Sequence, residues 1–205
     1  MIDIMQEIDA IRRGVRRDDD SVTVTIDRTY ATGAEDVWDA ITKPERVARW
    51  FAPLSGDLRE GGEFQVEGNA SGQILKCDRP HLLRMTYGGP TSIVELRLVP
   101  QGESTKLEVE HTVPLAIAQS GAGALWVGPG WDGGFLMLGQ YLRGEAPEDP
   151  VAAEGTLERQ QFNARSAQAW ADAVTASGTA TAEEVAGGLQ VALQQFAPSQ
   201  AEHGS

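Results

Sequence analysis

The chain has 205 residues, 41% of them hydrophobic, and its 17 Lys and Arg stand against 30 Asp and Glu, for a net charge of −13. A chain of this size can bury a core, and its acidity argues against a nucleic-acid backbone or an anionic membrane as partner. No apolar run reaches the roughly 18–20 residues of a membrane span, and residues 1–14 lack the apolar core of a signal peptide, so we expect a cytoplasmic protein. The single cysteine, Cys77, excludes an internal disulfide and a four-cysteine zinc site.

The N-terminal segment, residues 1–20, predicts an amphipathic helix that ends in arginines, which suit the negative end of a helix dipole. Its apolar residues recur at helical spacing: Ile4, Ile8, Ile11 and Val15. The next segment, SVTVTID at 21–27, alternates apolar and polar side chains and predicts a half-buried strand.

Two short helices are expected within residues 30–51. Thr32 precedes Glu35, and Thr42 precedes Glu45, at the spacing of a capping box, in which side chains satisfy the first N–H groups of a helix. Both helices carry apolar side chains on one face, so both are expected to pack against an apolar surface.

From residue 57 to residue 113, alternating segments and short turns predict about six antiparallel strands. A helix over 131–143 follows, with its apolar residues on one side: Trp131, Phe135, Leu138 and Leu142. A sheet with one polar face needs its apolar face covered. We therefore expect an α+β helix-grip fold, in which a curved antiparallel sheet of about six or seven strands wraps on this long helix, with a cavity between sheet and helix.

Residues 145–205 differ in composition, with 2 Lys and Arg against 9 Asp and Glu. After the linker-like EAPEDP they predict two amphipathic helices, separated by Ser177-Gly178, the second capped by Thr181 and Glu184. The expected division is an N-terminal helix at 1–20, a core domain at 21–144 and an acidic, alanine-rich helical extension at 145–205. The extension helices need a surface, on the core domain, on a second copy in a homodimer, or on a protein partner.

A resemblance now becomes specific. The VWDAITKPERVARWF pair, the DLREGGEF hairpin, the ILKCDRPHLLRMTY and LRLVPQGESTKLEVEHTV strands and the GWDGGFLMLGQYL helix, in this order over residues 21–144, resemble the SRPBCC (START-like) superfamily. Within it they are most similar to the family named after the C-terminal domain of the activator of the heat-shock-protein-90 ATPase. The alanine-rich tail resembles an extension of some bacterial members. The resemblance implies a hydrophobic cavity and, for most bacterial members, no assigned chemistry.

His111 is the polar residue that strand phase singles out. Along TKLEVEHTV it shares a face with Leu107 and Val109, so it points the same way as the apolar side chains. It is either a polar anchor or acid/base group for a ligand, or a neutral, hydrogen-bonded core histidine.

Five aromatic residues are the other candidates for a ligand-binding site: Trp50, Phe64, Tyr87, Trp131 and Phe135. With His111 they could line a pocket, where a tyrosine hydroxyl and indole N–H groups would contact a ligand. Plain core packing is the competing interpretation for each of them.

Other motifs carry no function. Gly128, Gly130 and Gly133 match a dinucleotide-binding pattern but open no βαβ unit, so we interpret them as a flexible lead-in to the long helix. His81 and His203 are expected to be solvated, and the spacing of the histidines predicts no metal site and no cofactor. Asn69-Ala70-Ser71 is a glycosylation sequon, without meaning in a cytoplasmic protein.

Three functions remain open. The hypothesis we favour is a binder of a small hydrophobic or amphipathic molecule, with no catalytic residues. A polyketide-cyclase-like enzyme would need several inward polar groups, and phase offers only His111 and Tyr87. A co-chaperone-like activator of the heat-shock-protein-90 ATPase would need a protein-binding surface.

Overall fold

The computed structural model describes residues 2–201, which divide into two compact units. One contains the chain up to Ile26, Val113–Leu136 and the residues from Ala152 onward, and the other contains Asp27–Thr112 and Met137–Val151. Eight strands form one sheet with the hydrogen-bonded order β1-β2-β8-β7-β6-β5-β4-β3. The fold is α+β and matches the helix-grip fold, with eight strands where the sequence predicted six or seven.

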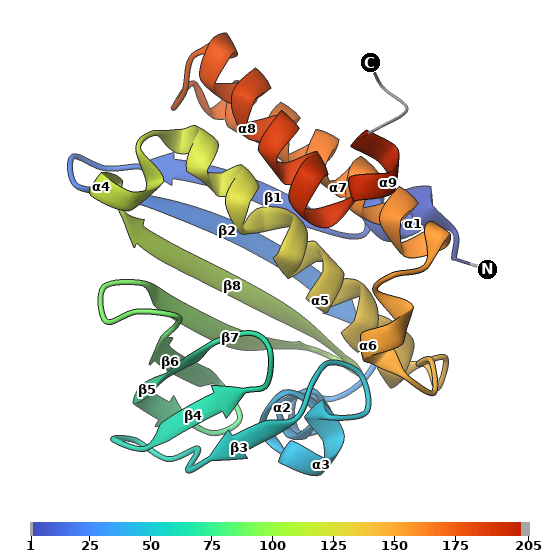
Figure 1. Ribbon diagram of the computed structural model, residues 1–205. Helices are drawn as coiled ribbons and strands as arrows, with labels where there is room; N and C mark the ends of the chain where they lie inside the picture. The colour runs from blue at the N-terminus through green and yellow to red at the C-terminus, as the bar shows by residue number, and fades with distance from the viewer. Residues whose placement is uncertain (1, 202–205) are drawn as a thin grey trace. The chain divides into compact units, whose positions relative to one another are not determined.

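The second unit, Asp27–Thr112 with Met137–Val151, is built from antiparallel strands and two short helices. The strands from β3 onward are β3 (Leu54–Gly56), β4 (Glu63–Val66), β5 (Ser71–Asp78), β6 (Leu82–Thr86), β7 (Ile93–Gln101) and β8 (Ser104–Pro114), and the helices are α2 (Ala34–Thr42) and α3 (Pro44–Val47). Figure 1 shows α2 and α3 beside β3. Along β8, buried and more exposed residues alternate through Val109 and His111, as the period of two predicted.

The two expected capping boxes in this unit are wrong. The residue before α2 is Gly33 and the residue before α3 is Lys43, and neither makes a side-chain cap. Thr32 Oγ1 instead donates to Asp36 Oδ2 at 3.0 Å. Thr42 is the last residue of α2, so its hydroxyl donates back to the carbonyl of Trp38, 2.6 Å away, and is not available to the next helix.

In the first unit, the expected N-terminal helix is shorter than predicted. Helix α1 spans Ile4–Asp9, and residues Arg12–Arg17 form strand β1, followed by β2 (Ser21–Tyr30). Gly14 favours the strand, because glycine weakens a helix and because a Cβ there would lie 2.6 Å from Thr25 Oγ1 of β2. Ile8 and Ile11 are nevertheless buried, as their spacing suggested.

The C-terminal helices are part of the core of the first unit. Phe162, Trp170 and Val174, all on the longest helix, are fully buried, and Figure 1 shows α7 and α8 side by side. The remaining helical elements are α4 (Leu115–Ala118), η1 (Gly121–Trp126), α5 (Gly128–Leu142), α6 (Pro150–Ala153), α7 (Leu157–Ser177), α8 (Ala182–Phe196) and α9 (Pro198–Ala201). Residues 202–205 of the expected extension lie outside the described residues.

The predicted helix signals in this part of the chain are confirmed. Helix α7 ends at Ser177, and Gly178 follows with a left-handed φ of 66°. Thr181 and Glu184 form the expected capping box at the start of α8. Across residues 2–201, no helix combines the length and the apolar character that crossing a bilayer requires.

A buried charge pair joins three elements of the first unit. The guanidinium of Arg13, on β1, donates from Nε to Asp132 Oδ2 on α5 at 2.8 Å, and Ser166 Oγ on α7 donates to the same oxygen at 2.5 Å. Asp132 is fully buried, and burial raises the pKa of its carboxyl although Arg13 and Ser166 act in the opposite direction. Removing either charge would leave the other buried alone, which makes the pair costly to break.

The glycines of the dinucleotide-like pattern serve close packing, so their interpretation as a flexible lead-in is wrong. Gly128 begins α5, and a Cβ there would lie 2.4 Å from the Trp170 ring of α7. A Cβ on Gly133 would lie 2.8 Å from Arg159 Nη2, also on α7. Glycine lets α5 approach these side chains.

Two adjacent glycines of α8 provide a matched test of this packing. A Cβ on Gly188 would lie 2.8 Å from Leu125 Cδ1 and 3.3 Å from Ala122 O, both in η1, whereas Gly187 has nothing within 4 Å. We expect Gly187→Ala to raise the free energy of unfolding by about 0.5–1 kcal/mol through helix propensity. Gly188→Ala gains the same helix propensity but should still lower the free energy of unfolding by about 1 kcal/mol, because the fully buried Leu125 would have to repack and the Ala122 carbonyl oxygen lies 3.3 Å away. Urea denaturation measures both, and equal effects of the two substitutions would contradict the contact between α8 and η1.

Candidate functional site

The candidate site lies on the buried face of the sheet in the second unit. The register pairs Ile74 with Met85, Met85 with Val94, and Val94 with His111, so these four residues form one row across β5, β6, β7 and β8. Directly opposite residues of antiparallel strands point to the same face. All four are buried, and His111 is 4% exposed. The sequence-based prediction that His111 points inward is confirmed.

His111 is held by a serine from the loop before β7. Its Nε2 lies 2.7 Å from Ser92 Oγ, at hydrogen-bond distance. Burial lowers the pKa of His111 from 6.5 to about 4 because the charged imidazolium would lose its hydration. At neutral pH the ring is therefore uncharged, and it presents a donor on one nitrogen and an acceptor on the other.

Tyr87 joins His111 to Phe64 through ring contacts. The Tyr87 ring lies edge-on to the His111 ring with centroids 6.0 Å apart, and its centroid lies 6.3 Å from that of Phe64. The Tyr87 hydroxyl donates to Asn69 Oδ1 at 2.5 Å, and burial raises the pKa of Tyr87 to about 12. Three of the six predicted site residues, Phe64, Tyr87 and His111, thus lie together through successive ring contacts.

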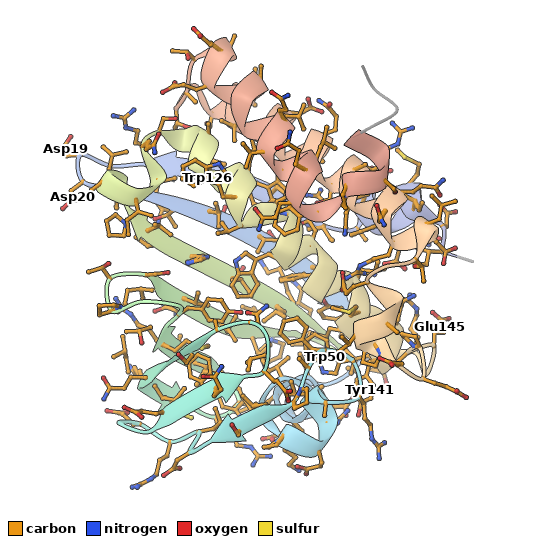
Figure 2. All side chains as sticks on the ribbon, in the orientation of Figure 1. Asp19, Asp20, Trp50, Trp126, Tyr141 and Glu145 are labelled. Carbon is orange, nitrogen blue, oxygen red and sulfur yellow. The ribbon has the colours of Figure 1, made fainter. Side chains whose placement is uncertain are left out.

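Trp50 occupies a different place in the same unit. It follows α3, where Figure 2 labels it, and its indole Nε1 donates to the carbonyl of Ala40 in α2 at 2.9 Å. Its ring stacks on Phe51 with centroids 5.5 Å apart. The polar edge of Trp50 thus ties α2 to the end of α3, which favours the packing interpretation, and ligand contact by its ring stays a prediction.

Trp131 and Phe135 belong to the first unit, on α5. Phe135 is buried and Trp131 is half-buried. A cavity lined by these two residues and the residues of the second unit stays a prediction.

A family profile decides to which proteins the chain is related. Residues 31–143 match the profile described as "Activator of Hsp90 ATPase homolog 1-like protein", which covers more than half of the chain. The chain belongs to this family. No protein of curated function matches the sequence significantly.

Solved structures of similar proteins extend the comparison. The crystal structure of CalU16 from Micromonospora echinospora is 36% identical, with a TM-score of 0.67, over 80% of this chain and 98% of that chain. DynU16, described as a putative protein in the dynemicin biosynthetic locus, is 25% identical with a TM-score of 0.55, over 65% of this chain and 50% of that chain. EF2215 from Enterococcus faecalis, 14% identical with a TM-score of 0.64 over 85% of this chain and 95% of that chain, shares the fold.

The sequence does not predict the hydrogen-bond partners of His111 and Tyr87. Ser92 precedes β7, and Asn69 lies in the turn between β4 and β5, within the glycosylation sequon. A serine at the start of a predicted strand, two residues before the residue opposite an inward histidine and therefore on the same face, is a weak signal that could have indicated the first partner. Among residues 2–201, no group of three or more His, Cys, Asp or Glu side chains is placed to hold a metal ion. His81 is exposed, and His203 lies outside the described residues.

The depressed pKa of His111 predicts a specific dependence of stability on pH. Between the folded pKa of about 4 and the unfolded value of 6.5, the unfolded chain binds the proton and the folded chain does not, so stability falls as the pH falls. Between pH 7.5 and pH 5.0 this group should cost the wild type about 2 kcal/mol of stability.

His111→Phe should remove this contribution, because phenylalanine fills a similar space and does not titrate. Urea denaturation of both proteins at the two pH values gives the double difference, in which all other titrating groups cancel. A double difference near zero would mean that His111 titrates in the folded protein as it does in water.

Proposed function

We propose that the protein binds a small hydrophobic or amphipathic molecule, with His111 and Ser92 as the polar contacts and Phe64 and Tyr87 as the aromatic ones. The observation that carries the proposal is the inward His111–Ser92 pair, a polar group in register with Ile74, Met85 and Val94 on a buried face. Ligand sites commonly combine an apolar lining with a few placed polar groups. The cavity against the 131–143 helix, with Trp131 and Phe135, is part of the proposal.

One similar structure supports the proposal. DynU16 is described as a putative protein in the dynemicin biosynthetic locus, and it is 25% identical over 65% of this chain. A protein that binds a small molecule fits a biosynthetic setting. The printed name of the family also suggests a co-chaperone-like activator of the heat-shock-protein-90 ATPase, and that alternative rests on the name alone.

An enzyme of the polyketide-cyclase kind is the second candidate. The observation in its favour is the same hydrogen bond of 2.7 Å between Ser92 Oγ and His111 Nε2, since a neutral imidazole beside a hydroxyl can accept its proton. The burial that keeps His111 neutral also makes it a weak base at neutral pH, because the best general bases have pKa values near the working pH. We therefore favour binding over catalysis.

Native mass spectrometry of the full chain, purified from its own host, tests the proposal directly. A small molecule retained by the protein and released on unfolding is the expected result. The same spectra report a homodimer or a protein partner held through α7 and α8, which stays a prediction.

His111→Phe separates the two candidates. For a binder, the substitution should weaken affinity by about 0.5–1.5 kcal/mol, the worth of one hydrogen bond, and leave the fold intact. For an enzyme, turnover should fall by about 10²–10⁴ fold, because a general acid/base group is lost. Calorimetric titration and an activity assay on the retained molecule measure the two effects.

Glu110→Gln is the matched control, because residue 110 is the neighbour on β8 and points to the opposite face. It should leave affinity and turnover unchanged. Unfolding by His111→Phe would make this histidine a structural residue and would count against both candidates.

A further inference from the structure

His111 and Tyr87 acquire charges of opposite sign when they titrate, so their pKa values indicate whether the site stabilises or destabilises ions. His111 becomes a cation when it gains a proton, and Tyr87 becomes an anion when it loses one. Their rings lie 6.0 Å apart. Burial lowers the pKa of His111 to about 4 and raises the pKa of Tyr87 to about 12, so both groups are held in their uncharged forms.

Burial is the cause of both shifts. A neighbouring cation would lower the pKa of both groups, and a neighbouring anion would raise both. Shifts in opposite directions arise when the surroundings reject charge of either sign.

The geometry gives the same answer. The side chains in register with His111 are Ile74, Met85 and Val94, all apolar, and its hydrogen-bond partner Ser92 is uncharged. An ion placed against this row would lose water without gaining a countercharge from these residues. A hydroxyl or a carbonyl would lose less and could be satisfied by a single hydrogen bond to the His111–Ser92 pair.

We propose that the ligand presents an uncharged polar group, a hydroxyl, phenol or carbonyl on an apolar body, to the His111–Ser92 pair, and that carboxylate, phosphate and ammonium groups are rejected. This inference rests on the proposed function and names its ligand class. Because an ion would lose its hydration against these apolar residues, we expect an uncharged probe to bind at least about 10-fold more tightly than an ion of the same shape.

Three probes with one aromatic body test the inference on the full chain at pH 7. 2-Naphthol is uncharged, 2-naphthoate is an anion and 2-naphthylmethylamine is a cation, and isothermal titration calorimetry gives the affinity of each. The cation controls for the net charge of −13, which repels anions and attracts cations anywhere on the surface. Repeating the series in about 0.5 M salt screens that long-range term, so a local preference should persist.

Two variants locate the bound probe. Ser92→Ala and His111→Phe should each weaken the binding of 2-naphthol several-fold, whereas Glu110→Gln, on the opposite face of β8, should not. Binding of 2-naphthol that both site variants leave unchanged would place the probe elsewhere and overturn the inference.

The remaining outcomes separate this inference from the function on which it rests. Binding of either ion as tightly as 2-naphthol, with the same response to Ser92→Ala, would overturn the ligand class and leave the proposed function standing. Binding of none of the three, together with no retained molecule in the native mass spectrum, would overturn the proposed function itself.

Discussion

The antiparallel register between β7 and β8 is the constraint on which the chemistry of the second unit depends. It sets Val94 opposite His111, and Val94 is in turn opposite Met85 of β6. Because side chains alternate along a strand, a slip of one residue in β8 would turn His111 outward and bring Glu110 or Thr112 to the buried face. A carboxylate in that position would replace a neutral imidazole among apolar neighbours, at a large cost in desolvation. The cost of burying that carboxylate among apolar residues therefore disfavours a shifted register of β8.

Periodicity in the sequence was enough to predict the face of His111 but not its partners. Alternation along β8 is a property of the strand itself, so the orientation of the imidazole follows from the residues beside it. Ser92 and Asn69 lie outside the strands, and their positions depend on the course of loops, which periodicity does not describe. The ring contacts of Tyr87 likewise depend on which strands are neighbours. The pairings of β6 with β7 and of β7 with β8 are tertiary contacts, which the alternation within one strand does not describe.

Local signals were less dependable where tertiary contacts competed with them. The capping box at Thr181 is present, whereas those expected at Thr32 and Thr42 are not. At the N-terminus, helical spacing predicted a single helix, but Arg13 lies on a strand and its guanidinium reaches Asp132, 119 residues away. A pairing over such a distance leaves no trace in a local pattern. The charged residue inside the apolar sequence of α5 was the signal that could have revealed it, since a buried carboxylate requires a partner.

The Arg13–Asp132–Ser166 cluster also bears on how the protein is synthesised. Its members come from the beginning, the middle and the end of the chain, and Ser166 lies on α7, among the last elements to be made. Because chains emerge from the ribosome in order, Arg13 and Asp132 must wait for α7 before their surroundings are complete. Most of the second unit, Asp27–Thr112, is one continuous stretch and is available much earlier. Vectorial synthesis therefore favours a nascent chain in which β8, which carries His111, is already paired with β7 while the first unit is still open to solvent.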